Sequence, residues 1–339
     1  MKIPPIHLNL KLFACLLVTL LLAVLFCESG AAPAAATKSK SGDVECPYYR
    51  LPESLIDIGF ELGGEKVPIS IPDVKERIEF QINFLLLDAR SVLAEWMNEK
   101  RKYSWILEEI LTKEGVPKDF AWLSPVMTGV NRTSNSRTPP VGIWSLNKPC
   151  DLSEGLEMHD DAWRDDRLDI FLATKCFASR IKALKGELGN SWLAASVANV
   201  LSVQDVKDLT QRWESASVWD IPLPDQLEDM ISRWAAFKII GTHRSVFGLR
   251  FPDPPPLTYD NLTAIELTKD LAVKDIGKFL NVPAKLILEL NPKIKISSGV
   301  FPAKMNGKTL THSIAVPSGV GKVFLRKLQE AGYVAGYRQ

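Results

Sequence analysis

Apolar residues recur at steps of three and four over most of the chain, which predicts a mainly helical protein. Between Val74 and Leu111 this period predicts one long amphipathic helix or a pair of helices that begins at Pro72-Asp73. A short apolar helix is predicted over 120–127, with Pro125 near its end. Three further helices are predicted between glycine, asparagine and proline positions, over residues 168–188, 191–201 and 226–240.

The pattern changes after a proline-rich segment at 252–256, which predicts a stiff linker. Residues 262–268 and 309–316 alternate like strands, and two short amphipathic helices are predicted between them, over 271–280 and 283–290. This order predicts a β-α-α-β unit of about sixty residues, which is too small to bury a large core alone. We therefore expect this unit to pack on the larger helical domain.

The first residues have the pattern of a secretory signal peptide. Lys2 and Lys11 precede an apolar run from Leu12 to Phe26, and the alanines within 31–36 offer small-residue cleavage sites. We expect residues 1–32 to be removed and residues 33–65 to form a flexible linker. The expected product is therefore exported.

The N-terminal run also permits two other fates. A permanent membrane anchor needs roughly 20 apolar residues, and the run is shorter than that. A lipoprotein acylated at Cys27 is the second alternative, but Leu25-Phe26 before it are bulky where such sites favour small residues. No later segment is apolar and long enough to span a bilayer, so no integral span is expected after processing.

Composition narrows the kinds of partner and cofactor. Lys+Arg (41) and Asp+Glu (40) nearly cancel, so no broad basic field favours nucleic acid as a partner. Outside the signal peptide, the cysteines permit one disulfide and one remaining thiol, with the pairing open, among Cys46, Cys150 and Cys176. The later histidines do not form a recognised ligand pair, so neither a metal nor another cofactor is expected: His159, His243 and His312.

Four motifs carry the chemistry. The first closes the stretch from Gly115 to Val130 and contains Met127-Thr128. The others follow in chain order: a loop with Ser136 that leads to Gly142-Ile143-Trp144-Ser145-Leu146, the cluster Asp165-Asp166-Arg167-Leu168-Asp169 before Ala173-Thr174, and Asn190-Ser191-Trp192-Leu193-Ala194-Ala195 before Val197-Ala198-Asn199-Val200-Leu201. Their order and spacing together are more specific than any one of them.

In this order the motifs resemble the family 1 lytic transglycosylases of bacterial cell walls, of the membrane-bound murein transglycosylase D type. The small C-terminal unit resembles a LysM-type sugar-binding module at Leu288-Glu289-Leu290-Asn291-Pro292, although Lys269-Asp270-Leu271-Ala272 replaces the usual Gly-Asp-Thr-Leu start. The resemblance implies a mainly α (α+β) protein. Its parts would be a goose-lysozyme-like domain over 66–253, a β-α-α-β LysM-like module over 257–318 and a C-terminal tail over 319–339.

The family's reaction needs one acid, a Glu that protonates the glycosidic oxygen before the muramic 6-hydroxyl closes on C1. By resemblance that Glu corresponds to Met127, whose thioether neither donates nor accepts a proton in this range. Neighbouring positions differ as well: Thr128 stands for a Ser, Ser145 for a Gln, and the Tyr-Asn-Ala-Gly element keeps only Asn199. No catalytic residue is therefore predicted, while scaffold positions such as Trp144 are retained.

Three hypotheses follow. The first is a pseudoenzyme that binds or senses peptidoglycan glycan strands or regulates an envelope protein, through a groove with Thr128, Ser136, Gly142, Ile143, Trp144, Ser145 and Asn199. The second is an active lytic murein transglycosylase that cleaves the MurNAc-GlcNAc bond with a relocated acid, among Glu154, Glu157, Asp160 and Asp161. The third is an envelope scaffold that has lost sugar binding.

Some residues in these motifs have two interpretations. Trp144 suits either stacking on a sugar face or packing as an anchor, because a tryptophan has an apolar body and a polar edge. Asn199 could hold an N-acetyl group through its amide or satisfy backbone groups, and the first role is slightly favoured. The cluster Asp165-Arg167-Asp169 is interpreted as structural ion pairing and helix capping, and Met127 as core filling.

Overall fold

The computed structural model describes residues 48–128, 141–150, 157–250 and 255–334. The chain from Tyr48 onward forms one compact unit. The predicted signal peptide, Cys46, Ser136 and Glu154 lie outside the described residues.

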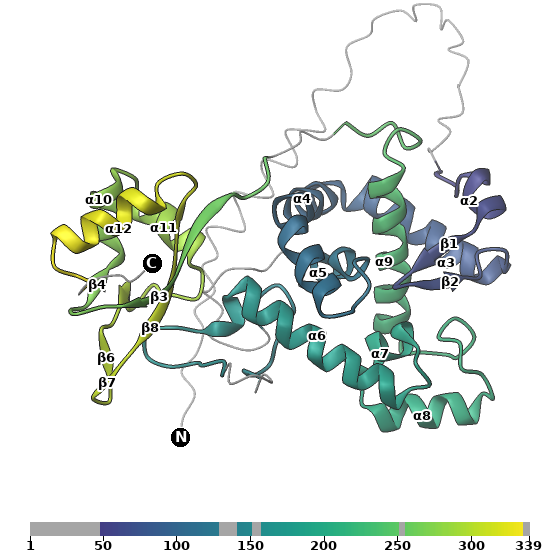
Figure 1. Ribbon diagram of the computed structural model, residues 1–339. Coiled ribbons are helices and arrows are strands. Elements are labelled where there is room, and N and C mark those ends of the chain that lie inside the picture. The colour runs from purple at the N-terminus through teal and green to yellow at the C-terminus, as the bar shows by residue number, and fades with distance from the viewer. Residues whose placement is uncertain (1–47, 129–140, 151–156, 251–254, 335–339) are drawn as a thin grey trace, which may run out of the picture. The chain divides into compact units, whose positions relative to one another are not determined.

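Most of the unit is helical. The predicted helix pair is confirmed as α3 (Pro72–Asn83) and α4 (Arg90–Lys113), joined by a single π-helical turn, η1 (Phe84–Asp88). The other helices of this part are α5 (Phe120–Thr128), α6 (Ile170–Glu187), α7 (Trp192–Ala198), α8 (Val203–Arg212) and α9 (Asp225–Thr242). Helix α4 packs on α5 and α6, and α9 packs on α3 and α5 (Figure 1). Their apolar faces form a first hydrophobic core, with Trp234, Phe120, Phe177 and Phe237 fully buried.

The segment predicted as a flexible linker over 33–65 is ordered from residue 48 onward. It contains α2 (Glu53–Ile58) and an antiparallel hairpin, β1 (Phe60–Leu62) with β2 (Glu65–Val67). Leu55, Phe60 and Leu62 are buried in the first core. The linker prediction is wrong for these residues because elements of three to six residues are too short to show a clear hydrophobic period.

The C-terminal part has the predicted β-α-α-β order. Strand β3 (Tyr259–Glu266) pairs antiparallel with β8 (Thr311–Pro317), and α10 (Val273–Leu280) and α11 (Ala284–Leu290) lie between them in sequence. Two short pairs complete it, β4 (Leu271–Ala272) with β5 (Val300–Phe301) and β6 (Lys304–Met305) with β7 (Lys308–Thr309). A second hydrophobic core lies between the helices and the sheet.

The region predicted as a C-terminal tail over 319–339 contains a further helix, α12 (Gly321–Glu330). Phe324 and Leu328 of this helix are fully buried in the second core. The backbone N–H of Thr268 also bonds to the carbonyl of Tyr333, which ties the end of α12 to the loop after β3. The module therefore extends past residue 318, and the tail prediction is wrong over 321–330.

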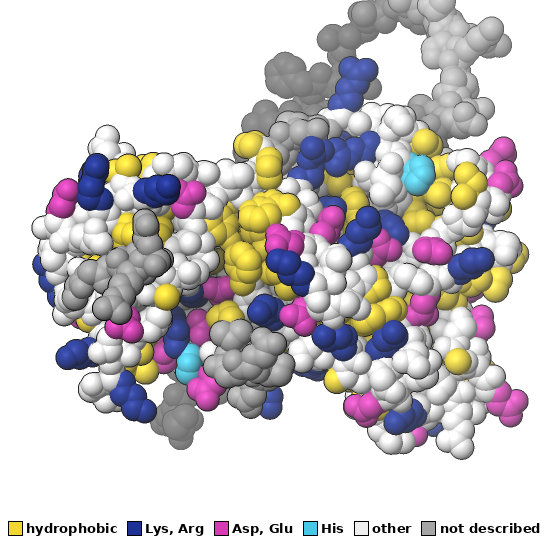
Figure 2. All heavy atoms as spheres, in the orientation of Figure 1, with side chains coloured by type: hydrophobic (Ala, Val, Ile, Leu, Met, Phe, Trp, Pro, Cys, Tyr) yellow, Lys and Arg dark blue, Asp and Glu magenta, His cyan; other side chains and the backbone are white. Residues whose placement is uncertain are grey.

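The fold is thus mainly α with four small two-stranded sheets among the described residues. Over this part of the chain, no helix is both long and apolar enough to cross a membrane. Basic and acidic side chains are interspersed over the face in Figure 2 rather than gathered by sign.

Candidate functional site

Met127 lies in the last turn of α5 and is half-buried, packed against the first core. The end of this helix is bonded to the turn that follows it in the described chain. The Ser124 hydroxyl donates to the Ile143 carbonyl (2.8 Å), and the Ser145 hydroxyl donates to the Met127 carbonyl (3.3 Å). Thr128 donates back to the Ser124 carbonyl (3.1 Å). The structure therefore brings Met127 and Thr128 together with the Gly142–Ser145 turn, as the motif spacing predicts.

The Gly142–Ser145 turn is closed by an antiparallel bridge between Val141 and Leu146. Gly142 has φ +75°, and a Cβ added there would lie 2.2 Å from the carbonyl oxygen of Arg167. Ser145 also has a left-handed backbone, with φ 48°. Only glycine fits at position 142, so this predicted site residue has a role in backbone packing.

Trp144 is a packing anchor. Its side chain is 1% exposed, and its ring stacks on Phe177 with the centroids 3.8 Å apart and the planes at 10°. The indole Nε1 donates to Thr174 Oγ1 at 2.9 Å. A ring enclosed in this way cannot stack on a sugar from solvent, so the structure contradicts the sugar-contact role for Trp144, and Ile143 is buried as well.

The remaining predicted binding residues are dispersed. Thr128 and Ser145 keep partly exposed hydroxyls at the end of α5. Asn199 lies elsewhere, as the C-cap of α7, where its backbone carbonyl accepts from Arg180 at 3.2 Å. In the described part of the chain, no hydrogen bond joins Asn199 to the end of α5. Of the predicted binding residues that the structure describes, Thr128 and Ser145 are thus the half-buried polar ones beside Met127.

A small cavity of about 20 Å³ lies beside Thr128, and one of the residues that line it is an acid outside the four motifs. Its walls come from α4, α5 and the turn, and Glu99 supplies the carboxylate among them. Tyr103 also lines it, and burial raises the pKa of that phenol to about 12. Glu99 belongs to the polar face of a long helix, where an acid normally indicates a solvated surface. Only the fold brings it to the end of α5.

The acids predicted as substitutes have structural roles where the structure describes them. Asp160 pairs with Arg167 (2.7 Å) and with Lys295 (2.8 Å). Asp161 accepts from the backbone N–H groups of Trp163 and Arg164, which forms a tight turn. Both carboxylates therefore stabilise the 157–169 loop. Glu157 is exposed at a different and larger pocket.

The interpretation of Asp165, Arg167 and Asp169 as a structural cluster is confirmed. The Asp165 carboxylate accepts from Arg167 Nε (2.8 Å) and Nη2 (2.7 Å), and this hydrogen bonding raises the pKa of the guanidinium. Asp169 is the N-cap of α6, accepting from the backbone N–H groups of Phe171 and Leu172. These bonds fix the loop that enters α6, and therefore the position of Thr174 and Phe177 under Trp144.

Cys150 and Cys176 form a disulfide, with their Cα atoms 5.9 Å apart. The bond ties the segment after the Gly142–Ser145 turn to the middle of α6. Among the residues that the structure describes, no three histidine, cysteine or acidic side chains gather as a metal site would require.

No protein-family model matches this chain, and no curated protein matches it either.

Proposed function

We propose that this protein is an exported pseudoenzyme that binds peptidoglycan glycan strands and has lost lytic transglycosylase activity. The observation that carries the proposal is Met127 at the position of the family's acid. Its side chain packs against the first core, and only its backbone carbonyl accepts a bond, from Ser145. A thioether supplies no proton to a leaving oxygen.

The size of the missing effect supports inactivity. A positioned general acid contributes roughly 10²–10⁴ in rate, and uncatalysed glycoside cleavage is extremely slow. Among the described residues, the hydroxyls beside Met127 belong to Thr128 and Ser145, and they hydrogen-bond but do not ionise near neutral pH. We therefore infer that this region contacts a glycan through hydroxyl and backbone groups without cleaving it.

The C-terminal β-α-α-β unit favours glycan binding over a scaffold without sugar affinity. Its resemblance to a LysM-type module at Leu288–Pro292 is the reason. Asn291 in this motif is 3% exposed, and its amide bonds both to the Ile287 carbonyl and across to Ala315 of β8. The motif asparagine thus joins α11 to the sheet, which supports the same fold element in this chain.

An active enzyme with a relocated acid is the second candidate, and Glu99 favours it. This residue lines the small cavity with Thr128 and Ile143, so a carboxylate lies close to the site from which the family's acid is missing. Asp160 and Asp161 are weaker candidates because neither lines this cavity and both stabilise the 157–169 loop. Glu99 therefore joins Glu154 and Glu157 as the residues to neutralise.

Digestion of purified sacculi tests the proposal. We expect the protein to sediment with sacculi and to release no anhydro-muropeptides. The Met127→Glu variant should release them if the groove still accepts glycan, and Met127→Leu is the matched control that keeps an apolar side chain. Release by the unmodified protein, abolished by Glu99→Gln, would establish the second candidate instead. Failure to sediment, with a protein partner captured, would favour the scaffold.

A further inference from the structure

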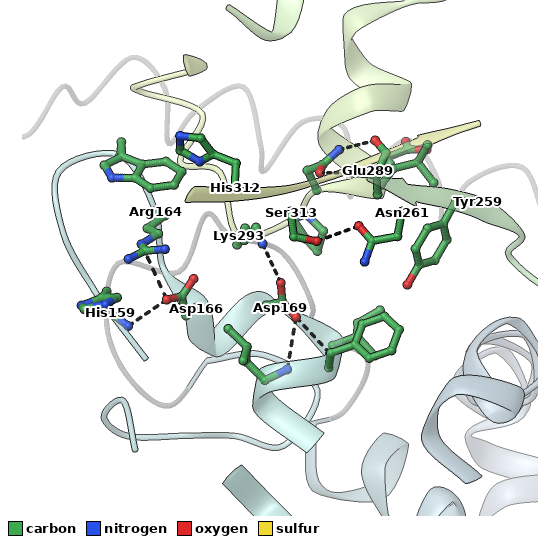
Figure 3. A pocket seen from close by; sticks show the side chains of 18 of the residues that line it. His159, Arg164, Asp166, Asp169, Tyr259, Asn261, Glu289, Lys293, His312 and Ser313 are labelled. Atoms are coloured by element: carbon green, nitrogen blue, oxygen red, sulfur yellow. Dashed lines mark hydrogen bonds and ion pairs between the residues drawn. The ribbon is translucent and has the colours of Figure 1, made fainter. Parts of the chain in front are cut away.

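A second and much larger pocket, of about 540 Å³, lies far from Met127 in sequence. We call it the junction pocket. One side comes from the 157–169 loop and the start of α6, and the other from β3, β8 and the segment after α11 (Figure 3). Its volume suits a small organic ligand. Its lining includes residues of the Asp165–Asp169 cluster and of the Leu288–Pro292 motif, but the proposed function assigns no ligand to it.

The junction pocket has an excess of negative charge. Its lining carries four carboxylates and two fixed cations: Glu157, Asp166, Asp169, Glu289, Arg164 and Lys293. Both cations lie beside carboxylates, although Arg164 Nε has no hydrogen-bond partner among the described residues. Lys293 pairs with Asp169 at 2.9 Å, and Arg164 lies 3.4 Å from Asp161 and 3.6 Å from Asp166. Burial lowers the pKa of His312, which favours its neutral form there.

Asp166 is the second observation that points to a ligand. Its side chain is 1% exposed, and one carboxylate oxygen, Oδ2, accepts from the backbone N–H of His159 at 2.9 Å. The other oxygen, Oδ1, has no hydrogen-bond partner among the described residues. Figure 3 shows the carboxylate turned into the space between Arg164 and Lys293. Burial raises the pKa of this carboxyl despite Arg164 nearby, because the ionised form lacks full compensation.

The opposite part of the pocket is apolar or aromatic. Phe171 is 37% exposed although it is a large apolar residue, and it lines the pocket with Leu257 and Tyr259. Such a wall accommodates the hydrocarbon part of a ligand, and an aromatic face also attracts a cation. At the rim, Glu157 and Glu289 are exposed and make no ion pair with a described residue.

We propose that the junction pocket binds an alkylammonium group, with the ammonium donating to Asp166 and the aliphatic stem against Phe171 and Tyr259. An ammonium supplies the donor that Asp166 Oδ1 lacks and the positive charge that the lining lacks. An anion would meet a lining in which carboxylates outnumber the fixed cations. A neutral saccharide would supply hydrogen bonds but no charge. The inference goes beyond the proposed function and does not depend on glycan binding.

Calorimetric titration of the purified full chain tests it with four probes. These are 1,5-diaminopentane, the peptide acetyl-Ala-Lys-amide, the same peptide with its lysine Nε acetylated, and N-acetylglucosamine. We expect saturable binding of the first two and roughly tenfold or greater loss on acetylation, because a charge-assisted bond disappears. The amine that binds with the higher affinity indicates whether the natural ligand is a free amine or a lysine within a peptide.

Variants connect this binding to the pocket. Asp166→Asn should weaken amine binding roughly tenfold or more. Because Asp166 also holds the His159 backbone, Glu289→Gln at the exposed rim is a second variant that should fold normally and weaken binding severalfold. Glu187→Gln, at the exposed end of α6, is the matched control and should bind like the unmodified protein. Equal binding of the acetylated peptide, binding of the saccharide alone, or no amine binding would each overturn the proposal.

Discussion

Gly142 is the residue at which the Gly142–Ser145 turn contacts the Asp165–Asp169 cluster. Its missing side chain lets the turn before Trp144 lie directly on the backbone of Arg167, where a Cβ would be 2.2 Å from the carbonyl oxygen. Gly189 has a similar backbone, with φ +63°, but no atom lies within 4 Å of the position of its Cβ. The two glycines therefore separate the cost of a left-handed backbone from the cost of a steric clash.

We expect Gly142→Ala to lower the free energy of unfolding by more than about 3 kcal/mol, because backbone strain and overlap with Arg167 add together. Gly189→Ala should cost only about 1–2 kcal/mol, since it introduces strain alone. Urea denaturation of the two variants beside the unmodified protein measures both values. Similar losses for the two variants would show that the turn shifts away from Arg167 without cost.

Helix α6 is the element on which the region around Met127 depends most. Its first turn is capped by Asp169, and its next turns carry Thr174 and Phe177, which hold Trp144. Cys176 lies between these two residues and is joined to Cys150. The first half of α6 thus positions both ends of the segment from Gly142 to Cys150.

Removing the disulfide should therefore destabilise the protein without changing its fold. For a separation of 26 residues, the loss of the cross-link costs about 3 kcal/mol through the greater freedom of the unfolded chain. The variant Cys150→Ala/Cys176→Ala should melt at a lower temperature than the unmodified protein. A reductant should lower the melting temperature of the unmodified protein to that of the variant and leave the variant unchanged. A reductant effect of the same size on both proteins would contradict this assignment.

The sequence predicts the long elements better than the short ones. Helices α3 and α4, and the β-α-α-β order, follow from clear periods of three to four and of two positions. The hairpin β1–β2 and helix α12 were missed, because the first is too short for a period and the second follows the last residue of the family resemblance. The burial of Trp144 could not be predicted, since it depends on Phe177 and Thr174 meeting it from another helix.

At the scale of the whole described unit, Trp163 connects the two parts. It belongs to the helical part by its sequence position, but its side chain lies in the second hydrophobic core. Trp163 comes before α6, yet it is 5% exposed within the second core, against Phe301 and His312. The backbone around it pairs with the segment after α11, through the bridge between Arg164 and Ile294. A side chain that packs in a core so distant in sequence leaves no local pattern in the chain. The sequence could therefore predict that the small unit packs on the helical part, but not that Trp163 makes the contact.

We expect Trp163→Ala to cost about 3–5 kcal/mol, as for a large aromatic residue removed from a core. The loss should affect the C-terminal part first, so calorimetry should show an earlier unfolding transition and limited proteolysis should begin within residues 255–334. Trp213→Ala is the control, because that indole is 52% exposed and its removal should change stability by no more than about 0.5 kcal/mol. An unchanged first transition in Trp163→Ala would contradict the anchoring role.

The position of Trp163 also decides how the chain can be divided. A cut in the proline-rich segment near residue 255 would leave an N-terminal fragment with a solvent-exposed indole and a C-terminal fragment with an empty space in its core. Each fragment would then be the other's natural ligand. If the two fragments are produced separately, they should bind each other through that indole. Their affinity would then give the interaction free energy between the two parts, which cannot be measured while they are covalently joined.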